Sequence, residues 1–455
     1  FNRSAKSILI TAQMKARFDI EQDTLTPTEL ISVLLKARVD LLWNGGIGTY
    51  VKSTLEAHTD VGDKSNDSLR VDAGELRCKV IGEGGNLGIT QLARMEFGLN
   101  GGRSNTDFID NAGGVDCSDH EVNIKILLNA VVARGDLTLK HRDELLEAMT
   151  DSVAELVLRN NYRQVQAISL AEYQANERSG EYRRFISSLV DAGKLDRELE
   201  FLPSDEELAD RKVHGQSLTR PELSVLVSYS KAILKEELID SDLGVDPHLA
   251  TAVQTAFPAQ LVTEYAEELS EHRLHREIMC TQIANDIINR MGLNFVSRQR
   301  KATGAPIADV ARAYTSVVEV FAIADTWEQI EALDHSVEAH VQLDMMLNLI
   351  RLVKRAVRWL LRNRRHELSP TGTIAEFAAG VEQLREALPN MLRGDAAERY
   401  SSLVERYEEA GVAPALAAAV AGTIQAYTAL GIIQAAEETH APLLEVAELY
   451  FFMGE

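Results

Sequence analysis

Asparagine occurs at three places early in the chain where a short apolar run gives way to glycine or another small residue. The three residues are Asn44, Asn86 and Asn111. A side-chain amide both donates and accepts hydrogen bonds, which suits a ribose hydroxyl or a carboxamide. Because glycine has no Cβ, the backbone beside these amides can approach a ligand closely. If the apolar runs are parallel strands, their ends share one edge of a sheet, and the pattern predicts a crevice for a polar, flat ligand.

Tight turns are the alternative explanation of these clusters, since glycine and asparagine are common in turns. Three clusters in succession, each directly after an apolar run, favour the crevice. Neither 45–48 nor 82–85 completes the G-x-G-x-x-G spacing of a pyrophosphate-binding loop. The chain begins with Phe1 instead of methionine, so we expect it to be cut from a longer one. If the ligand is a dinucleotide, its pyrophosphate loop is expected upstream of this residue.

The elements that would position these residues are short strands alternating with helices. Strands are predicted at residues 7–10, 39–43, 78–81 and 107–110. Capping-box spacing at 26–29 predicts one helix start, and the same spacing at Ser118 and Glu121 predicts another. Alternation of helices and buried strands predicts parallel βαβ units, so the first part is expected to be α/β with a partial Rossmann-like parallel sheet.

The pattern of predicted elements changes near residue 135, after which successive helices are predicted. Capping-box spacing recurs at 204–207, 219–222 and 373–376. The stretch 412–436 is rich in Ala, Leu, Ile and Val and predicts a mostly buried helix. The sequence therefore predicts an α/β part over residues 1–135 and an all-α part, a long C-terminal helical domain, over residues 136–455.

Composition excludes several classes of partner. The 455 residues carry a formal net charge of −22, and such a surface repels nucleic acid and anionic lipid. No apolar run approaches the ~20 residues that span a bilayer, so no membrane association is expected. The three scattered cysteines suit a reducing cytoplasm. His272, His275 and Cys280 have helical spacing, but arginines between them disfavour a cation, and we expect no metal site.

One basic helix offers a different reading of the second part. Arg351, Arg355 and Arg358 line one side of a helix whose other side is apolar. This pattern is typical of surfaces that bind nucleic acid or lipid. On a chain this acidic, a packed helix with internal or intersubunit salt bridges is favoured.

Four segments give the sequence a family resemblance. They are LLWNGGIGTYVK at 41–52, GEGGNLGIT at 82–90, NAGGVDCS at 111–118 and LTRPELSVL at 218–226. In these segments the chain resembles the large NAD-specific glutamate dehydrogenases of bacteria. The resemblance implies that residues 1–135 are the C-terminal half of a Rossmann-like NAD-binding domain. It also implies NAD as cofactor, L-glutamate and 2-oxoglutarate as substrate and product, and a homo-oligomer.

The resemblance also implies roles for individual residues. The smaller glutamate dehydrogenases carry related signatures, E-G-A-N and N-A-G-G-V-x-x-S, in which the first asparagine contacts the nicotinamide ribose side of the cofactor. Asn86 matches that asparagine, Asn111 matches the one near nicotinamide and substrate, and Ser118 matches the serine that binds the glutamate side-chain carboxylate. This chain has Gly85 where the smaller enzymes have alanine, and it lacks their proline soon after Asn86.

Two sets of binding residues are expected, and no catalytic residue is expected. The expected cofactor-binding residues are Asn44, Gly45, Gly46, Gly84, Gly85, Asn86 and Asn111. The expected substrate-binding residues are Asn111, Gly113, Gly114 and Ser118. The catalytic lysines and the acid/base aspartate of the family belong to its substrate domain, so no catalytic residue is expected here. Asp110 and Asp116 are expected to accept local backbone hydrogen bonds.

Three alternatives stay open at this point. Ser118 suits a helix cap as well as a carboxylate site, and the two roles can coexist. The chain could be a helical regulatory module with a degenerate nucleotide fold. It could also belong to a dehydrogenase for another amino acid, such as leucine or phenylalanine.

Overall fold

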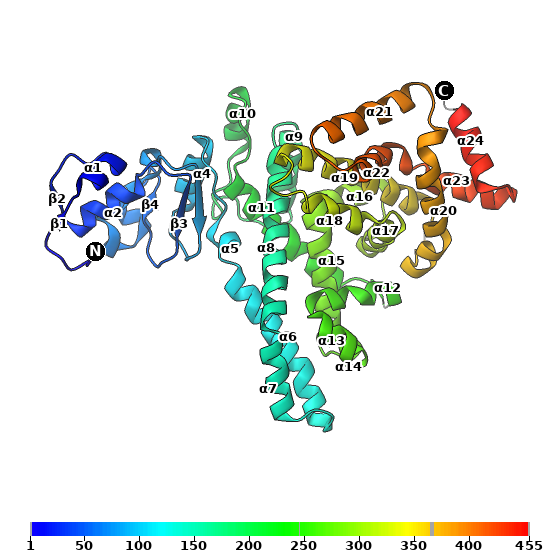
Figure 1. Cartoon of the computed structure of the whole chain (residues 1–455), viewed down its shortest axis with the longest axis horizontal. Coiled ribbons are helices and arrows are strands. Elements are labelled where there is room, and N and C mark those ends of the chain that lie inside the picture. The colour runs from blue at the N-terminus through cyan, green and yellow to red at the C-terminus, as the bar shows by residue number, and fades with distance from the viewer. Residues whose placement is uncertain (1, 245, 365–367, 454–455) are drawn as a thin grey trace. The chain divides into compact units, whose positions relative to one another are not determined.

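The computed structural model describes residues 2–244, 246–364 and 368–453 (Figure 1). It divides into two compact units, Phe1–Ser230 with Phe257–Ala259, and Lys231–Ala256 with Gln260–Glu455. The first contains all the described strands, and the second is helical. This is the predicted order of an α/β part followed by an all-α part. The predicted domain boundary after residue 135 falls at the end of a helix and stays a prediction.

The strands of the first unit are short and pair two by two. They are β1 (Ile8–Leu9), β2 (Thr24–Leu25), β3 (Leu41–Asn44), β4 (Val51–Lys52), β5 (Val71–Asp72) and β6 (Val80–Glu83). β3 pairs with β6 in parallel, and β4 pairs with β5 in parallel. β1 and β2 form an antiparallel pair. The parallel pieces confirm the predicted α/β character.

The first helices of this unit alternate with these strands, the later ones follow one another without strands, and the last, α11, extends into the second unit. They are α1 (Ala12–Phe18), α2 (Pro27–Leu35), α3 (His58–Val61), α4 (Gln91–Leu99), α5 (Asp107–Asp110), α6 (Gly113–Arg134), α7 (Leu139–Ala148), α8 (Thr150–Tyr173), α9 (Ser179–Asp191), α10 (Asp205–Val213) and α11 (Arg220–Ile239). Figure 1 shows α6 and α8 side by side. The apolar core around the strands joins Val51, Val71, Ile81 and Ile89 to Phe97 of α4.

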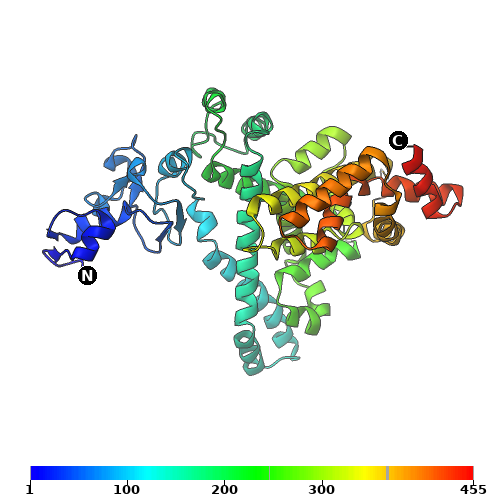
Figure 2. The same ribbon diagram turned by 45° about the horizontal axis from the view of Figure 1, so that its top comes forward.

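The second unit is built from helices of very different lengths. They are α12 (Pro247–Ala250), α13 (Ala259–Glu264), α14 (Ala266–Ser270), α15 (His275–Met291), α16 (Phe295–Thr303), α17 (Ile307–Val320), α18 (Ile323–Glu331), α19 (Ala339–Asn363), α20 (Pro370–Met391), α21 (Gly394–Glu409), α22 (Pro414–Ala426), α23 (Ala429–Thr439) and α24 (Leu443–Met453). α22 packs against α19, whereas the C-terminal helices α23 and α24, red in Figure 2, pack against α20 and against each other.

α19 is the predicted basic helix, and the structure confirms that it is packed. Its apolar side is buried, and it contacts α16, α17, α18 and α22. The Arg355 guanidinium lies 4.9 Å from the ring centroid of Tyr427. Arg351 donates a hydrogen bond to Asn348 at 2.8 Å. The guanidinium groups thus bind side chains of the same unit.

Two of the predicted helix caps are confirmed, and another predicted helix start is wrong. Full capping boxes begin α2 at Thr26 and α10 at Ser204. The start predicted at residues 373–376 is wrong, because α20 already begins at Pro370. There Ser369 accepts a hydrogen bond from the Gly372 amide and proline occupies the first helical position. Serine followed by proline is the stronger start signal, since proline has the backbone angle of a helix and needs no amide partner there.

The apolar stretch 412–436 forms two helices instead of the single predicted one. α22 and α23 meet at a bend of 63°. Among the described residues, no single helix has both the length and the apolar composition of a membrane span, and only this bent pair reaches them jointly.

Tyr407 of α21 makes the stability of the helical unit sensitive to alkaline pH. Its hydroxyl donates to Asp344 at 3.0 Å and accepts from the Asn348 amide at 2.8 Å. Burial, with the Asp344 carboxylate nearby, raises the pKa of Tyr407 to about 12. The folded state therefore keeps a proton that the unfolded chain loses near pH 10. Stability from this residue is complete below pH 10 and is lost as pH rises to 12, by about 2–3 kcal/mol.

We expect Tyr407→Phe to flatten that loss. The free energy of unfolding, from urea titrations at pH 9 to 12, should fall less steeply in the variant than in the parent chain. Parallel pH profiles would show that the buried hydroxyl does not titrate as described.

Candidate functional site

The parallel strands β3 and β6 end together and bring two glycine-rich loops side by side. Asn44, the last residue of β3, lies opposite Glu83, the last residue of β6. The Asn44 carbonyl accepts hydrogen bonds from the amides of Gly84 at 2.8 Å and Gly85 at 3.1 Å. The two predicted strand ends therefore share one edge, as the crevice hypothesis requires.

Packing explains three glycines here, one in β6 and two in the loop that follows it. A Cβ on Gly82 or Gly84 would lie 2.6 or 2.7 Å from the indole ring of Trp43. A Cβ on Gly85 would lie 2.4 Å from the carbonyl oxygen of Gly46. Glycine at these positions lets an aromatic ring and a second backbone approach the loop. At Gly46 a Cβ would meet no atom within 4 Å, so the structure leaves open space there.

Asn86 and Asn111 lie together. The Asn111 side-chain amide donates a hydrogen bond to the Asn86 side-chain oxygen. Asn86 belongs to the loop after β6, and Asn111 is the residue that ends α5. The structure thus joins the two segments that carry the family signatures.

The predicted strand at 107–110 is wrong, because these residues form the one-turn helix α5. The carbonyl of Thr106 accepts from the amides of Ile109 and Asp110. Both aspartates of the turn are fixed by the neighbouring loop and strand. Asp107 accepts from the Leu87 amide at 2.8 Å, and Asp110 accepts from the Glu83 amide at 3.1 Å. These contacts favour a turn that points both carboxylates back toward β6.

Asn44 lies against the same loop, but its amide faces a different space. Its side-chain oxygen accepts from the Gly46 amide at 3.3 Å. Its side-chain nitrogen is buried and has no hydrogen-bond partner among the residues that the structure describes. Asn44 lines a cavity of 270 Å³ with Leu35, Leu42 and Tyr50, whereas Asn86 and Asn111 do not. The structure brings two of the three asparagines together and places the third beside them.

The substrate-binding candidates lie at the start of α6, whose cap position, Ala112, is six residues before the predicted cap, Ser118. Gly113 and Gly114 occupy its first turn, and Ala112 before them provides no side-chain cap. The helix start predicted at Ser118 is therefore wrong. Ser118 is exposed inside the helix, and its hydroxyl donates to the Gly114 carbonyl at 3.2 Å. Because glycine has a low helix propensity, the sequence of this glycine pair did not predict a helix start.

A buried ion pair behind the loop was missed by the sequence analysis. Glu83 is 1% exposed, and Arg94 of α4 is 3% exposed. Arg94 donates to both oxygens of Glu83, at 2.6 and 2.9 Å. Burial raises the pKa of Glu83, and the guanidinium opposes that rise. Two features of the sequence could have indicated this pair. One is a carboxylate inside Gly-Glu-Gly at a strand end, and the other is an arginine on the apolar side of the next helix.

The two aspartates beside the crevice differ in their contacts. Asp110 accepts from the backbone amide of Glu83, which lies 27 residues away, so the predicted local donor is wrong; it also accepts from Asn105 at 2.8 Å. Burial raises its pKa, against the effect of these hydrogen bonds. Asp116 instead accepts from the side-chain amide of Asn160 at 2.9 Å.

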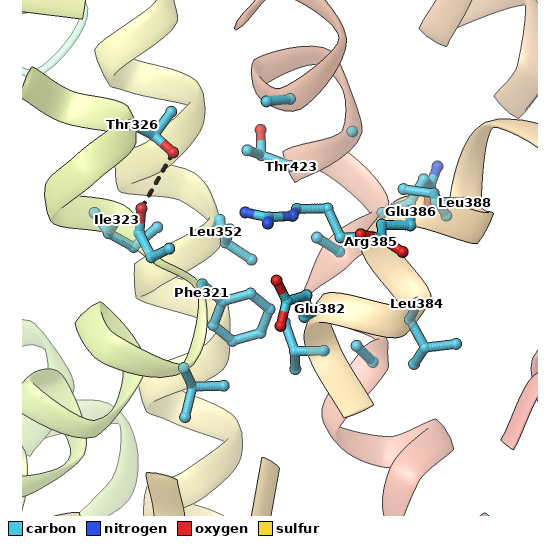
Figure 3. Close-up of a pocket in the computed structure, with 18 of the residues that line it drawn as sticks. Phe321, Ile323, Thr326, Leu352, Glu382, Leu384, Arg385, Glu386, Leu388 and Thr423 are labelled. Carbon is cyan, nitrogen blue, oxygen red and sulfur yellow. Dashed lines mark hydrogen bonds between the residues drawn. The ribbon is translucent and has the colours of Figure 1, made fainter. Parts of the chain in front are cut away.

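The helical unit holds a separate cavity that the sequence did not indicate. Its volume is 730 Å³, and its walls come from α18, α19, α20, α22 and α23. Apolar side chains dominate the walls. Figure 3 shows the Glu382 carboxylate and the Arg385 guanidinium, on one stretch of α20, pointing into it near Phe321 and Leu352.

Comparison with known proteins agrees with the family resemblance. Residues 1–171 match the family model for the bacterial NAD-glutamate dehydrogenase catalytic domain. Residues 215–455 match the model for the glutamate dehydrogenase C-terminal region. The two matches cover the signature segments and most of the helical part.

Several curated relatives align along the chain. It is 57% identical over 454 residues to the NAD-specific glutamate dehydrogenase of Pseudomonas aeruginosa, covering 100% of this chain and 28% of that protein. It is 54% identical over 454 residues to that of Halomonas elongata, with the same coverage. It is 38% identical over 457 residues to that of Mycobacterium tuberculosis, covering 99% of this chain and 28% of that protein. The chain therefore spans 28% of the length of these relatives and belongs to the family of bacterial NAD-specific glutamate dehydrogenases.

Proposed function

We propose that the full-length protein oxidatively deaminates L-glutamate to 2-oxoglutarate and ammonium, and that this chain supplies the nicotinamide side of its cleft. The observation that carries the proposal is the hydrogen bond between Asn86 and Asn111. It joins two separate signature segments beyond the end of the parallel strand β6, where open α/β sheets bind ligands.

The residues present fit a nicotinamide nucleotide. The two exposed or half-buried side-chain amides of Asn86 and Asn111 lie side by side. Ile47 is 94% exposed and Leu87 is 64% exposed, so an apolar ligand surface can pack beside the amides. The residues proposed to hold the cofactor are Asn44, Gly45, Gly46, Gly84, Gly85, Asn86 and Asn111. When bound, NAD would accept the hydride from the α-carbon of glutamate.

The proposed substrate site is the start of α6. Its first-turn amides, at Gly113 and Gly114, receive no side-chain cap, and a helix N-terminus attracts a carboxylate. With Asn111 and Ser118, they would bind the carboxylates of glutamate. A full-length protein that oxidises leucine or phenylalanine faster than glutamate would favour the alternative of another amino-acid dehydrogenase.

Asn86→Ala in the full-length protein is expected to weaken NADH binding about tenfold, because a hydrogen bond to a bound group contributes about 1–1.5 kcal/mol. The measurement is a fluorescence titration with NADH. Asn363→Ala, which removes an asparagine that donates to the Trp359 carbonyl of its own helix in the other unit, is the control and should bind as the parent does. Equal affinity of parent and Asn86→Ala would remove the cofactor role of Asn86.

We also propose that the full-length protein is a cytoplasmic homo-oligomer. The three cysteines of this chain are free, which suits a reducing compartment. Leu449, Phe452 and Met453 on α24 expose more than half of their surface, which suits an apolar contact between subunits. Light scattering on the full-length protein measures the mass directly, and a monomer would contradict the assembly.

A further inference from the structure

Arg94 links the two segments that carry the paired asparagines. Its guanidinium holds Glu83, at the end of β6, through two hydrogen bonds. The same group lies 3.3 Å from a carboxylate oxygen of Asp107, in α5. Asn86 follows Glu83 by three residues, and Asn111 ends the helix that begins at Asp107. One buried cation therefore contacts the anchors of both segments.

The loop that carries Asn86 is also held through Leu87 and Ile89. Leu87 has a left-handed backbone, with φ at 54°, which is unusual for a leucine. Its amide donates to Asp107 at 2.8 Å, and its carbonyl accepts from the Thr49 hydroxyl at 2.7 Å. The Ile89 amide donates to Glu83 at 3.2 Å. The strained backbone is thus held by the two carboxylates that Arg94 joins.

Electrostatics explain why an arginine is needed there. Two carboxylates this close repel each other, and Glu83 is almost fully buried. A planar guanidinium can bind one of them in a bidentate manner and still reach the other. A lysine ammonium can neutralise the charge but cannot reproduce both contacts. Without a cation, the loop and α5 would be expected to separate.

We propose that Arg94 is a positioning residue for cofactor binding: by bridging Glu83 and Asp107 it sets the loop of Asn86 against the helix that ends in Asn111. This rests on the proposed function, because the consequence for NADH depends on the two asparagines binding it. The consequence for the loop itself depends only on the geometry.

The first test is hydrogen–deuterium exchange on the full-length protein. In Arg94→Met, the amides of residues 84–90 should exchange at least about tenfold faster, because the hydrogen bonds of Leu87 and Ile89 lose their fixed acceptors. A peptide covering residues 24–35, at the separate β2 and α2 contact, should be unchanged. Unaltered exchange over 84–90 would overturn the proposal whether or not the protein binds NADH.

The second test is a double-mutant cycle on NADH affinity. Arg94→Met should raise the Kd about tenfold, since displacement by about 1 Å weakens a positioned contact strongly. Combined with Asn86→Ala, the Kd should stay near tenfold above the parent value, because Arg94 acts through Asn86. If the Kd of the double variant rose about a hundredfold, as the product of the two single effects, Arg94 would act independently of Asn86. That result would overturn the positioning role.

Two further variants separate positioning from general damage. Arg94→Lys, the milder change, should give intermediate exchange and an intermediate Kd, and it keeps the test available if Arg94→Met does not fold. Arg290→Met removes another buried arginine, which pairs with the half-buried Asp286 at 2.8 Å, and should alter neither measurement. If the parent binds NADH and Asn86→Ala binds equally well, the cofactor role of Asn86 fails, while the exchange result still decides the role of Arg94.

Discussion

Glu222→Ala is expected to lower the free energy of unfolding by about 3–5 kcal/mol, because it breaks a buried charge pair by removing one partner. Glu222 is fully buried. Its carboxylate accepts from Arg211 at 2.8 and 2.9 Å, and from the amide and hydroxyl of Thr219 at 2.6 and 2.7 Å. The side chain therefore both caps α11 and joins it to α10. Burial raises the pKa of Glu222, and the Arg211 guanidinium opposes the rise.

Urea unfolding of the chain, followed by circular dichroism, measures the loss. The matched control is Glu144→Ala, which removes an exposed carboxylate 3.6 Å from Lys140 and should change stability by less than about 0.5 kcal/mol. Arg211→Met should cost about as much as Glu222→Ala, and the double variant less than their sum. Additive losses would show that the two side chains do not act as a pair.

Gly85→Ala is expected to destabilise the first unit by about 1–3 kcal/mol through overpacking. The new Cβ would lie 2.4 Å from the Gly46 carbonyl oxygen and 3.1 Å from its carbon. Both atoms are backbone, so the two loops must move apart and weaken the hydrogen bonds from Gly84 and Gly85 to Asn44. The full-length variant should therefore also bind NADH less tightly. This close approach gives a physical reason for glycine where the smaller enzymes have alanine.

The control for Gly85→Ala lies on the facing loop. A Cβ on Gly46 would meet no atom within 4 Å, so Gly46→Ala should leave stability unchanged or raise it by up to about 1 kcal/mol. Thermal unfolding of both variants, measured side by side, compares them. Equal stability of the two variants would mean that the loops are not in contact as described.

Short sequence motifs predicted those parts of the fold that depend on interactions between residues close together in the chain. Thr26 and Ser204 were identified as helix caps because the capping box is complete within four residues. β3 was identified from an apolar run that ends at Asn44. The family was predicted from signature segments, and the two family models confirm it.

Tertiary contacts determine the parts of the structure that the sequence did not predict. Residues 107–110 carry too short a pattern to separate a strand from a turn of helix, and the contacts of Asp107 and Asp110 with Leu87 and Glu83 settle it. The start of α6 was placed too late, because Gly113 resembles a turn residue. The pairing of Arg94 with Glu83 depends on the path of the intervening loop, which residue spacing does not encode.

The most direct measurement is a cryo-EM structure of the full-length protein with NADH bound. The account predicts cofactor density with its nicotinamide end within hydrogen-bond distance of the Asn86 and Asn111 amides, and an intact bridge from Arg94 to Glu83 and Asp107. Density for NADH elsewhere, with Asn86 and Asn111 still bonded to each other and free of ligand, would contradict it.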